Sequence, residues 1–147
     1  MLLVNLIVAF LLQTPAKPVV VVGLMDGQQL AIEGPQFSGF IESRESGEPV
    51  LLYRLKQFRG EMKLSVIKRI DLSYEIGKPF FLTVTMKNGQ RVNVESDRRS
   101  FVIVKGATDT GTVIVKHPDP ISPPTRLMTG KPNRTHNLTI RYLEFPG

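Results

Sequence analysis

Apolar side chains that recur at every second residue, followed by residue pairs that favour tight turns, constrain this chain more than any other feature. Leu82, Val84 and Met86 alternate with Thr and Lys side chains, and Asn88-Gly89 follows directly. Alternation of this period places one face of a β-strand on a core and the other in solvent. An Asn-Gly pair readily adopts the positive φ angles of a type I′ turn. The pattern therefore predicts a half-buried hairpin.

The same plan occurs earlier in the chain, where the apolar run 19–24 is followed by Asp26-Gly27 and then by the alternating segment 30–33. Helical periodicity is almost absent after Pro18. With 147 residues, 41% of them hydrophobic and 22% charged, the chain has the composition of a globular protein that buries a core. These observations predict an all-β fold.

The two halves of the chain share features that indicate an internal repeat. Three pairs of segments keep the same order: Asp26-Gly27 with Asn88-Gly89, 60–64 with 111–115, and 67–72 with 140–145. The last pair keeps one order of apolar, basic, variable, apolar, acidic and apolar residues. We therefore expect two β units, 17–77 and 78–147, with chance likeness between short β patterns as the alternative.

Spacing shows where the two units differ. Ile67 lies 41 residues after Asp26, whereas Ile140 lies 52 residues after Asn88. The longer second unit predicts an insert at about 117–138, before the closing strand.

The number of strands and the positions of the turns resemble the small barrels of the SH3-like and Sm-like class. Each unit has about five short strands, a tight early hairpin, a strand pair around Gly60 or Gly111, and a short closing strand. The resemblance implies an all-β fold of two tandem small barrels packed together, preceded by a short apolar N-terminal segment. A single β-sandwich is the alternative, because it gives nearly the same pattern.

The N-terminus is typical of a signal peptide. The run Leu2 to Leu12 is apolar except for Asn5, and a polar stretch with Thr14 and Ala16 follows. A helical span of the bilayer needs roughly 20 apolar residues, so this run is too short to cross. We expect residues 1–16 to be removed near Ala16 and the protein to be exported, periplasmic or secreted. The alternatives are a membrane tether formed by residues 1–12, and a first strand or helix of the fold.

Positive charge is concentrated in the second unit. The net charge is +6, and the excess of basic residues lies after Gly77. The proline-rich insert and its margins carry five cations: Lys116, Arg126, Lys131, Arg134 and Arg141. Proline holds extended backbone at low entropic cost, and arginine binds phosphate or carboxylate groups. We expect a contact with an anionic polymer, a lipid headgroup or an acidic protein surface, against the alternative of an ordinary solvated loop.

Catalytic and metal-binding patterns are not found in the sequence. Cysteine is absent, and the two histidines, His117 and His136, both fall in the predicted insert, with only Asp119 as a neighbouring carboxylate. The chain has no Gly-rich phosphate loop and no nucleophile elbow. We therefore expect a non-enzymatic protein without a cofactor or a metal, and the composition does not select an oligomeric state.

One segment offers an alternative function. Residues 58–62, Phe-Arg-Gly-Glu-Met, resemble the second signature of Sm-like proteins, which implies that Arg59 contacts RNA. The first Sm signature is absent and the second unit has Thr110-Gly111 in place of Arg-Gly. The chain also has no tryptophan and only 7% aromatic residues, so stacking surfaces for bases are sparse. We therefore expect nucleic acid to be an improbable partner.

Overall fold

The computed structural model describes residues 18–73, 81–97, 99, 101–117 and 140–147, and strands dominate them. In chain order the strands are β1 Val19–Leu24, β2 Gln29–Gly39, β3 Ile41–Glu42, β4 Val50–Leu55, β5 Phe58–Lys63, β6 Ile67–Leu72, β7 Phe81–Met86, β8 Arg91–Ser96, β9 Val102–Thr108, β10 Gly111–His117 and β11 Ile140–Glu144. A 3-10 helix, η1 Leu64–Val66, connects β5 to β6. The all-β prediction is confirmed.

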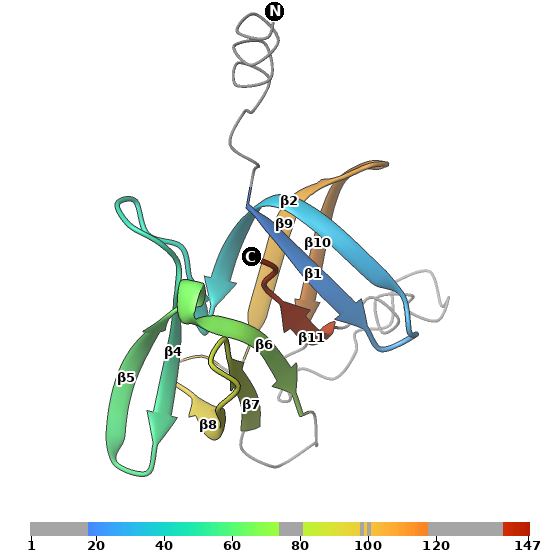
Figure 1. The fold of residues 1–147 in the computed structure, drawn as a ribbon. Coiled ribbons are helices and arrows are strands. Elements are labelled where there is room, and N and C mark those ends of the chain that lie inside the picture. Colours follow the sequence, from blue (N-terminus) through green and yellow to red (C-terminus); the bar gives the residue numbers. More distant parts are fainter. Residues whose placement is uncertain (1–17, 74–80, 98, 100, 118–139) are drawn as a thin grey trace, which may run out of the picture.

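The strands form one open antiparallel sheet in the order β10-β9-β2-β1-β11-β6-β7-β8-β4-β3, and β5 pairs with β4 (Figure 1). Strands of the two expected units, 17–77 and 78–147, alternate along this sheet. The structure therefore shows a single sheet rather than two separate tandem barrels. Alternating apolar residues determine which face of a strand is buried, but they do not select its neighbour. The expected signal peptide, the boundary between the two expected units and most of the insert fall in 1–17, 74–80 and 118–139, outside the described residues.

The first turn predicted from the sequence joins β1 to β2. The Gly27 N–H donates to the Leu24 carbonyl oxygen at 3.0 Å, and the Leu24 N–H donates to the Gln28 carbonyl oxygen at 2.8 Å. The Asp26 carboxylate accepts the Gln28 N–H at 2.9 Å. Gly27 has a φ of +89°, which a residue without Cβ adopts at little cost. The predicted hairpin is confirmed.

The second predicted turn joins β7 to β8 and has the same hydrogen bonds. Gly89 donates to Met86 at 3.0 Å, Met86 donates to Gln90 at 2.8 Å, and the Asn88 side chain accepts from Gln90 at 2.9 Å. Gly89 has a φ of +91°, but Asn88 is not in the positive-φ region. The type I′ prediction is wrong in both hairpins, because only the glycine adopts positive φ, as in a type I turn followed by a left-handed residue.

The pairing of β1 with β11 and the pairing of β7 with β6 are arranged in the same way. Val22 of β1 lies opposite Leu143 of β11, and Val84 of β7 lies opposite Ile70 of β6. Leu143 and Ile70 in turn lie opposite each other where β11 meets β6. The β1–β11 and β6–β7 pairings both contain an irregularity in register. Four buried apolar side chains therefore cross the middle of the sheet in one row, which continues the core from one half to the other.

Arg69 makes the polar contacts on the other face of the β6–β11 pairing. Its guanidinium lies 2.7 Å from the Glu144 carboxylate and 3.0 Å from the Asp71 carboxylate, and its central carbon lies 3.9 Å from the centre of the Tyr142 ring. The Tyr142 ring in turn fills the space beside Gly23, where a Cβ would lie 2.1 Å from a ring carbon. These side-chain contacts add charge attraction between β11 and β6, and ring packing between β11 and β1, to the backbone pairing of the strands.

Candidate functional site

Two of the five predicted cations fall in described strands. Lys116 lies in β10 and Arg141 lies in β11, and both are exposed. The other three, Arg126, Lys131 and Arg134, lie outside the described residues. The His117 Nδ1 lies 3.0 Å from the Ile140 carbonyl oxygen. His117 directly follows Lys116 in the chain, and Ile140 directly precedes Arg141. The structure therefore brings the end of β10, which carries Lys116, to the start of β11, which carries Arg141, and we call this meeting of the two strands the corner.

The charge of this corner is not neutralised by the described part of the chain. Within the described ranges, no ion pair involves Lys116 or Arg141, whereas Arg44, Arg54, Arg59 and Arg69 all have a carboxylate within 4.0 Å. Arg141 also lies at a register irregularity of β11. Two exposed cations at strand ends that meet favour the approach of an anion.

His117 lies in a strand and not in a loop insert, where the sequence analysis placed it. It ends β10 and is only 1% exposed, among the side chains of the core. Burial lowers the pKa of His117 to about 4, and the hydrogen bond with Ile140 opposes this only in part. Because a carbonyl oxygen only accepts, Nδ1 is the protonated nitrogen of the neutral ring. His117 is therefore a neutral core residue near neutral pH.

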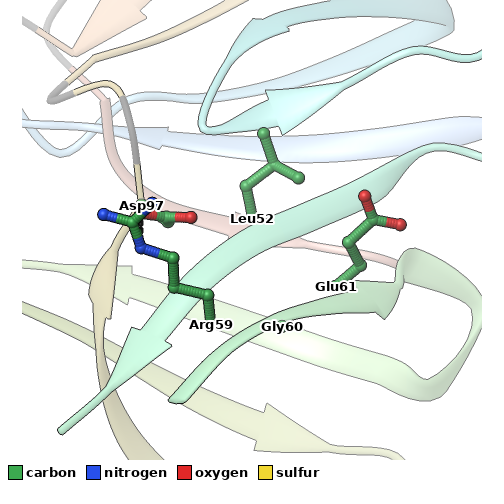
Figure 2. A pocket seen from close by; sticks show the side chains of 5 residues that line it. All are labelled: Leu52, Arg59, Gly60, Glu61 and Asp97. Carbon is green, nitrogen blue, oxygen red and sulfur yellow. Dashed lines mark ion pairs between the residues drawn. The ribbon is translucent and has the colours of Figure 1, made fainter. Parts of the chain in front are cut away.

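A separate hollow of about 200 Å³ contains Arg59, the residue that the Sm-like resemblance singled out. Leu52, Gly60, Glu61 and Asp97 line the rest of it (Figure 2). The Arg59 Nε lies 3.5 Å from the Asp97 carboxylate, and the Asp97 side chain is only 7% exposed. Arg59 belongs to β5, which pairs with β4 near one end of the strand order, whereas β10 lies at the other end. The two groups of candidate residues are therefore separate sites.

Both carboxylates of this hollow lie near an arginine. The Asp97 carboxylate lies 3.5 Å from Arg59, and the Glu61 carboxylate lies 2.7 Å from Arg44, so the negative charge of the hollow is largely balanced. Sequence reasoning missed both carboxylates as lining residues. Asp97 comes directly after β8, which lies beside β4 only because the two expected units interleave. A single acidic residue after a strand gives no signal for that position.

Among the described residues, no group of three or more His, Asp or Glu side chains is placed to hold a metal ion. His136 and Asp119, the second histidine and the carboxylate nearest to His117 in the sequence, lie outside the described residues. The described part of the chain also contains no helix with the length and hydropathy needed to cross a bilayer.

Comparisons of the chain with protein-family models, with curated proteins and with solved structures give no match.

Proposed function

We propose that this protein is an exported, non-enzymatic β protein of the cell envelope that binds an anionic ligand or partner. The observation that carries the proposal is the corner formed by Lys116 and Arg141, two exposed cations without an ion pair in the described part of the chain. Residues 118–139 connect directly to this corner and contain Arg126, Lys131 and Arg134. Five cations within one stretch of chain would form a basic surface for a polymer, a headgroup or an acidic protein.

Heparin serves as the anionic probe for this proposal. The full chain carrying Lys116→Glu and Arg141→Glu should elute from a heparin column at lower salt than the unchanged protein. The matched control carries Lys87→Glu and Arg91→Glu, because both residues are exposed and the change in net charge is the same. Equal elution of the two double variants would show that only net charge matters, and the corner would then have no special role.

The insert is tested by a second charge reversal. Changing Arg126, Lys131 and Arg134 together to Glu should weaken heparin retention more than the corner variant does, since three cations are reversed rather than two. Unchanged retention of this triple variant would exclude the insert from the binding surface.

Export and cleavage are proposed on the N-terminal sequence alone. The apolar run Leu2 to Leu12 and the small residues Thr14 and Ala16 support removal of residues 1–16. N-terminal sequencing of the mature protein should begin at Lys17. An intact Met1 would favour instead the tether formed by residues 1–12 or the cytosolic RNA-binding alternative, in which Arg59 contacts RNA.

We propose further that the two halves of the chain are repeats related to small SH3-like barrels. The matching hydrogen bonds of the two glycine turns support the repeat, as does the row Val22, Leu143, Ile70 and Val84. The 3-10 helix before the short strand β6 supports a closing strand of the expected kind. In this proposal each half of the sheet takes its first hairpin from one repeat and its last strands from the other.

A further inference from the structure

The tip of the β4–β5 hairpin exposes apolar side chains that the fold leaves uncovered. Leu55 and Phe58 lie opposite each other at the last strand pair, with exposures of 42% and 62%. Between them, Lys56 has a φ of +55°, and it is the one non-glycine residue with positive φ among those the structure describes. A lysine in this conformation is unfavourable, because its Cβ approaches the following carbonyl oxygen. The tip therefore combines exposed apolar surface with local strain, a pairing that points to a functional contact.

A second hairpin in the same sheet shows that the fold does not need apolar residues at such a tip. The β9–β10 hairpin lies at the other end of the strand order, and the two hairpins point to opposite sides of the molecule (Figure 1). Its tip is entirely polar or glycine: Thr108, Asp109, Thr110 and Gly111. The last residue pair of the β9–β10 hairpin is Thr108 with Gly111, whereas the last residue pair of the β4–β5 hairpin is Leu55 with Phe58.

The next strand pair of the β4–β5 hairpin places cations directly behind the apolar tip. Arg54 and Arg59 lie opposite each other and are both exposed. Arg54 lies 2.7 Å from the Glu95 carboxylate, whereas Arg59 lies 3.5 Å from Asp97 and keeps 63% of its side chain exposed. The guanidinium of Arg59 therefore has donors available for an external anion, one strand pair behind Phe58.

The Phe58 ring is held in place from one side. The Tyr53 and Phe58 ring centroids lie 6.2 Å apart with a tilt of 48°, and both rings lie close to Gly60, where a Cβ would approach each within 2.8 Å. Phe58 is thus ordered against its own hairpin while most of its surface stays exposed. An ordered aromatic side chain loses little conformational entropy when it inserts into another phase.

We infer that the β4–β5 hairpin tip is a membrane-contacting element, in which Leu55 and Phe58 enter the interface of a bilayer with anionic lipids while Lys56 and Arg59 contact lipid phosphates. A projecting tip with two apolar side chains suits a bilayer, which deforms around it, better than a protein surface, which would need a matching pocket. The order of apolar tip first and cations behind it matches the order of acyl chain and headgroup. The inference uses none of the residues of the corner at Lys116 and Arg141, so it does not depend on the binding site proposed there.

The absence of tryptophan from the chain provides a direct test. The full chain with Phe58→Trp is mixed with vesicles of phosphatidylcholine, either alone or with phosphatidylglycerol. Its fluorescence should shift to shorter wavelength with the anionic vesicles and should be quenched by brominated lipid. The control is Ile114→Trp on β10, because Ile114 is 57% exposed and lies away from the tip. An equal response of both variants, or none from Phe58→Trp, would overturn the inference, since either result shows that the tip is not inserted.

A partition measurement separates the apolar contribution from the charge. Phe58→Ser should weaken binding to phosphatidylglycerol vesicles about tenfold or more, as expected when one buried Phe is lost. Phe81→Ser is the matched control, because Phe81 is exposed to 46% in a different hairpin, and it should leave partition unchanged. Equal losses in the two variants would contradict insertion by the tip. If the Phe58→Trp fluorescence instead responds to a protein partner and not to vesicles, the surface binds protein and the inference is wrong.

Discussion

His117 gives the sharpest prediction of how stability depends on pH. Burial lowers its pKa from 6.5 to about 4, so the folded protein keeps the ring neutral over a range in which the unfolded chain binds a proton. The contribution to stability is fully present above pH 6.5, falls as the pH drops below 6.5, and is lost by about pH 4. At about 1.4 kcal/mol per pH unit, the fall from 6.5 to about 4 corresponds to roughly 3 kcal/mol of unfolding free energy.

The perturbation is His117→Leu, which removes the titrating group and keeps an apolar side chain of similar size. The variant loses the hydrogen bond to Ile140, so near neutral pH its stability should be lower by about 1 kcal/mol or more. The diagnostic quantity is therefore the slope of unfolding free energy against pH.

Urea denaturation at several pH values between 6.5 and 4 measures this slope in both proteins. All other side chains are common to the two proteins, so their contributions largely cancel in the difference between the two curves. The unchanged protein should lose roughly 3 kcal/mol more than the variant as the pH falls through this range. Parallel curves would refute the reasoning, because they would mean that His117 takes up its proton equally in the folded and unfolded chains.

Two further predictions concern the β6–β11 pairing and its neighbour β1. Gly23→Ala should destabilise the protein by about 1–3 kcal/mol, because a Cβ at Gly23 would lie 2.1 Å from the Tyr142 ring. In a Tyr142→Ala background the same change should cost almost nothing. An equal cost in both backgrounds would refute the contact. Arg69→Met should destabilise the protein by about 1 kcal/mol at low salt, because Asp71 and Glu144 lose their shared cation at a partly exposed site. Denaturation at high salt should show a smaller loss of stability. A loss that salt leaves unchanged would argue against a charge effect.

Sequence periodicity predicted the local structure well. The alternation at Leu82, Val84 and Met86 predicted β7, and the glycine after Asp26 or Asn88 predicted two hairpins. Both predictions depend on interactions between residues close together in the chain. The turn type was wrong, because a residue pair gives the position of a turn more reliably than its backbone angles.

Strand partners could not be predicted, because pairing depends on residues far apart in the chain. Nothing near Val22 in the sequence indicates that Leu143 lies opposite it. The alignment of segment 60–64 with segment 111–115 does not match equivalent positions in the two hairpins. Gly60 lies within β5 opposite Tyr53, whereas Gly111 begins β10 opposite Thr108, so the two glycines have different places in their hairpins.

For the candidate sites too, single residues could be identified from the sequence, but their neighbours in space could not. Lys116 and Arg141 were identified from charge alone, but their position at one corner required the contact between β10 and β11. Arg59 was identified from a short motif, and its partner Asp97 was not, since Asp97 reaches Arg59 only through the pairing of β8 with β4.

The account depends most on strands of the two expected units alternating in one sheet, and engineered disulfides test this directly. The chain has no cysteine, so each double variant forms its own disulfide or none. Val21→Cys with Glu144→Cys should oxidise readily, because the two residues lie opposite each other on β1 and β11, within the range of Cα separations that a disulfide spans. Val21→Cys with Asp71→Cys should stay reduced, because β11 separates β1 from β6. Rapid oxidation of the second pair and not the first would mean that β1 pairs with β6 inside its own unit, and the interleaved sheet would be wrong.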